Sequence, residues 1–133
     1  MPYLLDTNTA SHIIRKDNQA VERRRTRVAM SELAISTVTE GELRFGAARV
    51  PQAVRLRAAI EEFLFDVAVL PWDSNAAREY GELRASLERE GRAIGSLDMM
   101  IAAHALALGA VLVTSDSAIK RIRKLKIEDW TKG

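Results

Sequence analysis

Cysteine is absent from the sequence, which excludes a disulfide framework and any metal site built from thiolates. Long apolar runs are absent too, since none reaches the ~18 residues that a membrane span requires. The first residues also lack the basic segment followed by an apolar segment that marks a secretory signal peptide. We therefore expect a cytoplasmic protein that has no membrane partner.

Proline and glycine are scarce, with three and seven residues in a chain of 133. They are scattered singly, and no repeat or low-complexity segment divides the chain, so we expect one domain over residues 1–133. Hydrophobic residues make up 47 % of the sequence, which is enough for a real core. The net charge of +2 weakly favours anionic partners.

Short apolar segments alternate with longer helical segments along the chain. Strands are expected at residues 3–5, 33–36, 67–70 and 110–113. Helices are expected at residues 9–15, 18–30, from 37 or 39 to 50, 53–63, 75–90 and 97–108. Ser96 is the expected N-cap of the last helix and Gly109 its stop. Such alternation is typical of an α/β domain whose parallel sheet is covered by helices on both faces.

Four acidic residues are expected at one edge of this sheet. Asp6 directly follows the first strand, and Glu42 lies early in the helix after the second strand. The helix that begins near Asp98 is roughly 18 Å long, and the strand that leads to Asp116 is a little over ~20 Å long. Asp98 and Asp116 are therefore level with each other. All four acids belong at the carboxyl edge, where open α/β sheets bind ligands.

Each acid also has a purely structural explanation. Asp6 suits an Asx turn, and Glu42 suits a capping box with Thr39. Asp98 suits the positive end of a helix dipole, and Asp116 suits an N-cap. These separate explanations do not account for four acids at one edge, because two charges ~4 Å apart repel by about 4 kcal/mol at an effective dielectric near 20. Protonation or a cation would relieve this repulsion, and oxygen ligands suit Mg²⁺ or Mn²⁺.

Four segments of the sequence resemble PIN-domain ribonucleases, and more closely the VapC toxins of bacterial toxin–antitoxin pairs. The segments are YLLDTN, ISTVTEGELRFG, GRAIGSLDMMIAAHALALGAVLVTSD and IEDW. The resemblance covers the chain from end to end. It implies a three-layer α/β/α PIN-like domain with a central parallel sheet of four or five strands. It also implies a metal-dependent endoribonuclease that is inhibited by a VapB-type antitoxin, cleaves RNA such as tRNA or rRNA, and forms a homodimer.

The resemblance assigns the same catalytic role to the four acids. Asp6, Glu42, Asp98 and Asp116 are implied to be the catalytic residues and the ligands of Mg²⁺ (or Mn²⁺). Asp116 is the weakest match, because the family sometimes has asparagine there. A metal-bound hydroxide would attack the phosphorus, so no protein nucleophile is required.

A family pattern, T-x-x-E-L-x-x-G, decides between two neighbouring glutamates. It begins at Thr39 and selects Glu42 rather than Glu40, a choice that helical periodicity alone leaves open. Three further polar residues are candidates for orienting water or the metal ligands. They are Asn8, Thr114 and Ser115.

Two other classes of protein compete with this interpretation. A receiver-like phosphoacceptor domain normally has adjacent acids after its first strand, whereas LLDTN supplies only Asp6. A non-catalytic RNA-binding module with a PIN fold would lose acids, whereas this sequence keeps all four. His104 lies within an apolar helical run and is expected to be a packed histidine rather than a catalytic one.

Two basic segments remain open to interpretation. Residues 22–27 and 120–126 either hold RNA phosphates near the acidic edge or form solvated helix faces. Aromatic residues make up only 5 % of the chain, so few side chains are available to stack on bases. Trp72 and Trp130 are expected to be packing residues.

Overall fold

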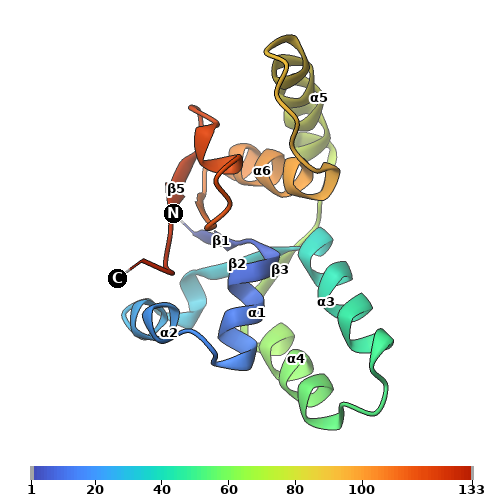
Figure 1. The fold of residues 1–133 in the computed structure, drawn as a ribbon, viewed down its shortest axis with the longest axis vertical. Coiled ribbons are helices and arrows are strands. Elements are labelled where there is room, and N and C mark those ends of the chain that lie inside the picture. Colours follow the sequence, from blue (N-terminus) through green and yellow to red (C-terminus); the bar gives the residue numbers. More distant parts are fainter. Residues whose placement is uncertain (1, 133) are drawn as a thin grey trace.

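A parallel sheet lies at the centre of the structure, a computed structural model that describes residues 2–132 (Figure 1). Its strands are β1 (Tyr3–Leu5), β2 (Leu33–Ser36), β3 (Ala68–Leu70), β4 (Val111–Val113) and β5 (Lys126–Glu128), in the order β3-β2-β1-β4-β5. All neighbours are parallel, and Leu5 is level with Val113. The carboxyl ends of β1 and β4 therefore lie at the same edge of the sheet.

Helices cover both faces of this sheet. They are α1 (Thr7–Arg15), α2 (Gln19–Arg25), α3 (Thr37–Arg49), α4 (Val54–Asp66), α5 (Ser74–Arg89) and α6 (Ser96–Leu108), with short 3₁₀ turns at Met30–Glu32 and Ile119–Arg121. Figure 1 shows α5 and α6 on one side of the sheet and α1, α2 and α4 on the other. This arrangement confirms the expected three-layer α/β/α fold.

Alternation along the strands divides the core in two. Leu4 packs with α5 and α6 on one face, whereas the next residue, Leu5, packs with α1, α2 and α4 on the other. Successive side chains of a strand point to opposite faces. Even a strand as short as β1 therefore contributes side chains to both halves of the core. No helix among residues 2–132 has the length and apolar character needed to cross a bilayer.

The main difference from the sequence-based expectation concerns α2. This helix ends at Arg25 instead of continuing to about residue 30. The amides of Arg27 and Val28 donate to carbonyls three residues earlier, and the Thr26 hydroxyl donates to the carbonyl of Arg23. These bonds tighten the last turn and compete with continuation of the helix.

The beginning of α6 is also different from the expectation. Gly95 is the N-cap, Ser96 is already helical, and no side chain caps this end. Gly109 does end α6, with a left-handed φ of 63° that glycine adopts without steric cost. The location of β5 at Lys126–Glu128 was not part of the expectation, which left the number of strands at four or five.

Candidate functional site

Asp6 joins the end of β1 to the start of α1. Its amide donates to the carbonyl of Val113 at 3.1 Å, and its Oδ1 accepts the Thr9 amide at 2.8 Å. Asp6 is thus the N-cap of α1, although it is only 5 % exposed. Capping uses one carboxylate oxygen, and no donor among residues 2–132 bonds to the other. The structural role of Asp6 therefore leaves half of its carboxylate for a ligand.

Glu42 and Glu40 on α3 have different partners. Oε1 of Glu42 accepts the hydroxyl of Thr7 at 2.6 Å, which brings Glu42 beside the beginning of α1. Glu40 instead pairs with Arg44 at 2.9 Å. The two glutamates are two positions apart, which is about 200° around a helix, so they lie on different faces of α3. Only Glu42 is directed toward Asp6 and its surroundings.

Asp98 lies in the first turn of α6 and experiences the charges of the other three acids. Burial raises the pKa of Asp98, and the negative charges of Asp116, Asp6 and Glu42 raise it further. No hydrogen-bond donor contacts the Asp98 carboxylate within the described part of the chain. The four acids expected from the sequence therefore form one electrostatic group at the carboxyl edge, which we call the acidic rim.

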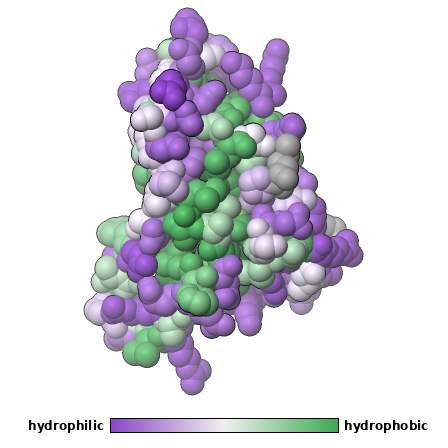
Figure 2. Space-filling view, turned by 180° about the vertical axis from the view of Figure 1, so that it is seen from behind, coloured by the Kyte–Doolittle hydropathy of each residue, from purple (hydrophilic) through white to green (hydrophobic). Residues whose placement is uncertain are grey.

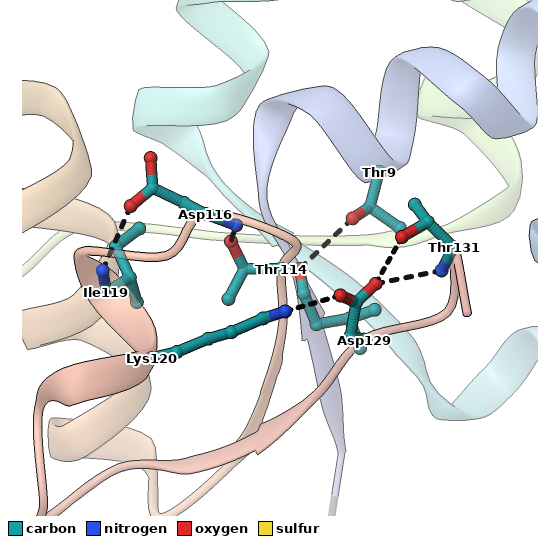
Figure 3. A network of polar contacts seen from close by, with 8 residues as sticks. Thr9, Thr114, Asp116, Ile119, Lys120, Asp129 and Thr131 are labelled. Carbon is teal, nitrogen blue, oxygen red and sulfur yellow. Dashed lines mark hydrogen bonds and ion pairs between the residues drawn. The ribbon is translucent and has the colours of Figure 1, made fainter.

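Asp116 follows β4 and is fixed on two sides (Figure 3). Its amide donates to Oγ1 of the fully buried Thr114 at 3.0 Å, and its Oδ1 accepts the Ile119 amide at 2.9 Å. Of the three candidate supporting residues, Thr114 thus contacts a rim acid directly. Asn8 and Ser115 are exposed and make no side-chain hydrogen bond to a described residue.

An ion pair beside the acidic rim was not expected from the sequence. Lys120 Nζ lies 2.5 Å from Oδ2 of Asp129, and Asp129 Oδ1 accepts the amide and hydroxyl of Thr131 (Figure 3). Burial alone would raise the pKa of Asp129, but the hydrogen bonds from Lys120 and Thr131 lower it. Asp129 is therefore a charged partner of Lys120. In the sequence, the only indication that Asp129 matters was its position in the family motif IEDW.

The donor atoms of the acidic rim are oxygens, the kind of ligand that a hard divalent cation prefers. All four ligand candidates are carboxylates, and their unbonded oxygens are not among the buried atoms that lack a partner, so solvent reaches them. No three acidic or histidine side chains within residues 2–132 are grouped closely enough to form a ready metal cage. The rim is an open set of oxygen donors of the kind that Mg²⁺ and Mn²⁺ prefer.

Comparison with known proteins decides the family. The model of the PIN domain family matches residues 3–125. A protein of Shigella flexneri named tRNA(fMet)-specific endonuclease VapC is 37 % identical over 132 residues, which are 98 % of this chain and 99 % of the relative. The chain belongs to the VapC family of PIN-domain ribonucleases. A Rickettsia felis protein named Ribonuclease VapC2 is 33 % identical over 99 % of this chain and all of the relative.

Solved structures of VapC-family complexes agree with the fold. The structure of VapBC2 from Rickettsia felis bound to a promoter DNA fragment matches with a TM-score of 0.89 and 32 % identity, covering 98 % of this chain and 99 % of that one. DNA-bound VapBC from Salmonella typhimurium matches with the same TM-score and 37 % identity, covering 98 % of both chains. The resemblance to VapC proteins that the sequence motifs indicated is confirmed.

Proposed function

We propose that this protein is the endoribonuclease toxin of a VapBC-type pair and that it requires Mg²⁺ or Mn²⁺. Membership of the VapC ribonuclease family supports the activity. The observation that carries the metal requirement is the acidic rim, where burial and then the charges of three neighbouring acids raise the pKa of Asp98. Such an arrangement is costly in a fold unless a cation shares it. The receiver-like alternative is not favoured by any of these findings.

The four acids of the rim would bind the cation together. Asp6, Glu42, Asp98 and Asp116 would supply the ligand oxygens. A bound divalent metal lowers the pKa of a water molecule and neutralises charge on phosphate oxygens. Helix capping holds Asp6 and an amide holds Asp116, so these carboxylates are positioned by the backbone.

Neither histidine is placed to replace the metal as the source of a nucleophile or base. His12 pairs with Asp17 at 2.7 Å on the surface of α1. His104 is only 2 % exposed and lies in the middle of α6. The proposed chemistry therefore assigns no role to a histidine, and the cation that the rim acids would hold would activate water for hydrolysis of the RNA.

A VapB-type antitoxin is the proposed protein partner. The VapC-family structures from Rickettsia felis and Salmonella typhimurium are VapBC complexes. On this chain Phe45, Val54 and Phe65 are exposed, Phe65 by 89 %, and Figure 2 shows apolar side chains gathered in a band along one face. Exposed apolar surface is suited to a protein partner, and an antitoxin arginine would pair bidentately with the rim carboxylates.

The substrate and its location follow from the same proposal. The Shigella flexneri relative is named for tRNA(fMet), which makes tRNA a candidate substrate here, with rRNA as the other candidate. Both RNAs are cytoplasmic, so the proposed activity also places the toxin in the cytoplasm. Sequencing of RNA 5′ ends after brief induction of the toxin would identify the cleaved RNA.

The test of the nuclease mechanism is substitution of the rim. Asp6→Asn and Asp98→Asn should each reduce RNA cleavage in Mn²⁺ by a factor on the order of 100 or more, since even outer partners of metal ligands cost roughly 10–100-fold. The matched control is Asp66→Asn, because Asp66 is exposed at the end of α4. If both rim variants cleave RNA and arrest growth as the control does, the mechanism is wrong.

A further inference from the structure

A hollow of about 490 Å³ lies between α2 and the segment that follows β5. Its lining includes Arg23, Arg24 and Arg27 from α2 and the turn after it, and Trp130 and Lys132 from the end of the described chain. We call it the basic hollow. It contains part of the first basic segment of the sequence, residues 22–27. This segment has no role in the proposed catalytic site.

The carboxylates in the wall of the basic hollow already have partners. Glu128 Oε1 accepts Arg24 Nη2 and Trp130 Nε1, both at 2.9 Å. Asp129 is paired with Lys120. The guanidinium of Arg24 also lies over the rings of Tyr3 and Trp130, 5.6 and 5.2 Å from their centroids. These contacts neutralise the acids and fix Arg24.

Three cations of the basic hollow remain available. Arg23, Arg27 and Lys132 are exposed, and none forms an ion pair with a carboxylate of residues 2–132. Trp130 is only 3 % exposed and lies beneath Arg24, so it offers no face for a base to stack on. The surface therefore presents positive charge without an aromatic face for base stacking. This combination suits the phosphate backbone of a nucleic acid.

The end of β5 connects the basic hollow with the acidic rim. The amide of Thr114 donates to the carbonyl of Glu128 at 3.0 Å, and Oγ1 of Thr114 accepts the amide of Asp116. Lys120 spans the same boundary, since its amide donates to the Asp116 carbonyl while its ammonium holds Asp129 (Figure 3). The end of β5 thus belongs to the wall of the hollow and is hydrogen-bonded to the segment that carries Asp116.

We propose that the basic hollow binds the phosphate backbone of the substrate RNA next to the scissile bond. Arg23, Arg27 and Lys132 contact phosphates, whereas Arg24 shapes the floor of the hollow. The contact is independent of base sequence and raises affinity for any RNA strand that reaches the rim. This inference rests on the proposed ribonuclease function, because it assigns the hollow to the same substrate.

The experiment measures RNA binding separately from cleavage. A fluorescein-labelled single-stranded RNA of about 20 nucleotides is titrated with the purified protein in EDTA, over a series of salt concentrations. The Arg23→Gln/Arg27→Gln variant should bind roughly tenfold more weakly than wild type at low salt. Its slope of log K against log salt should be smaller by about 1.4, since each phosphate contact to a single strand contributes ~0.7.

The matched control is Arg55→Gln/Arg89→Gln, which changes the net charge by the same amount. Arg55 on α4 and Arg89 on α5 are exposed, lie outside the lining of the hollow and form no ion pair with a described residue. This control should bind RNA within about twofold of wild type and keep its salt slope. Circular dichroism of both variants checks that each is folded.

Two results would overturn the assignment of the basic hollow. One is an equal affinity and salt slope in the Arg23/Arg27 variant and the control. The other is a loss of antitoxin binding in that variant while RNA binding is unchanged, which would assign the hollow to an acidic protein segment. Cleavage of the same RNA by wild type in Mn²⁺ reports on the rim alone. If wild type cleaves and the two variants bind equally, only the hollow assignment fails.

Discussion

At the scale of single residues, Glu40 and Glu42 show how position on a helix decides which partners a side chain reaches. Glu42 bonds to Thr7 at the rim, whereas Glu40 pairs with Arg44, which also holds Glu61 at 2.7 Å on the surface. Exposed ion pairs contribute little to stability. We predict that Glu42→Gln severely impairs Mn²⁺-dependent RNA cleavage and that Glu40→Gln changes it by less than about twofold. Initial cleavage rates check this, and the reverse ranking would refute the assignment.

Thr7 is predicted to position Glu42 through its hydroxyl. The bond of 2.6 Å joins residues 35 positions apart and fixes one carboxylate oxygen. Thr7→Val keeps the shape but removes the donor, and outer partners of metal ligands are worth roughly 10–100-fold in affinity or activity. The concentration of Mn²⁺ that gives half-maximal cleavage should therefore rise about tenfold or more in Thr7→Val.

Thr7→Ser provides the control for this prediction. It keeps the hydroxyl and loses only a methyl group, so it should restore the Mn²⁺ requirement of wild type. A merely structural role for Thr7 would reduce stability in both variants without moving the metal dependence. Equal Mn²⁺ dependence in wild type and Thr7→Val would remove Thr7 from the site.

The difference between the acids and Thr7 shows what the sequence can reveal at this scale. Asp6 and Asp116 were predictable because Asp6 directly follows one apolar strand segment and Asp116 lies three residues after another, and parallel strands bring such positions to one edge. Thr7 bonds to Glu42, and Lys120 bonds to Asp129, through particular side-chain conformations on separate elements. Spacing along the chain carries no information about such contacts.

At the scale of elements, periodicity predicted the interiors of helices better than their ends. The apolar run of α6 gave its length within a residue, but the expected cap Ser96 lies inside the helix. In α2 only Val21 is buried. With so little burial, hydrogen bonding by Thr26 and the tightened last turn determine where the helix ends. Neither effect appears in the hydrophobic pattern.

The packing of α6 leads to a prediction about acid sensitivity. His104 is buried, and its Nδ1 has no hydrogen-bond partner among the described residues. Burial lowers the pKa of His104, although the charge of Asp73 partly opposes this. Unfolded histidine titrates near pH 6.5, so below that pH the unfolded chain binds more protons than the folded one. The free energy of unfolding should therefore decrease from about pH 6.5 down to the folded pKa.

His104→Leu tests this prediction by removing the titrating group and keeping a side chain of similar volume. Urea unfolding at pH 7.5 and 5.5 should show a smaller acid-induced loss of stability in His104→Leu than in wild type. His12→Gln is the control, because His12 is the other histidine of the chain and lies on the surface. An equal acid-induced loss in wild type and His104→Leu would show that His104 is not responsible.

At the scale of the whole molecule, parallel topology brings together acids that are far apart in the sequence. β1 lies between β2 and β4, so the segments that follow all three strands meet at the carboxyl edge. The alternation of strands and helices in the sequence predicted this meeting of segments at the carboxyl edge. It did not predict the basic hollow, because the hollow needs the segment after β5 to fold back against α2. The proposed antitoxin complex and the expected homodimer are assemblies whose geometry one chain does not encode in a readable pattern.

The stability of the whole fold should report on the acidic rim. Repulsion among the carboxylates destabilises the folded state, and a cation that binds only this state stabilises it by mass action. With an assumed Kd of ~1 mM and ~10 mM Mn²⁺, the gain is about 1.4 kcal/mol. For a chain of this length, that raises the melting temperature by roughly 4–6 °C.

Asp98→Asn should separate repulsion from metal binding. Asp98 is the acid whose pKa is raised by burial and by the other three charges, so removal of its own charge relieves the folded state. In EDTA the variant should melt at or above the temperature of wild type, and it should lose most of the increase that Mn²⁺ gives. Melting curves of both proteins in EDTA and in Mn²⁺, at constant ionic strength, measure the four values. An equal increase in both proteins, or none in wild type, would mean that the four acids do not share a metal and that Asp6 serves only to cap α1.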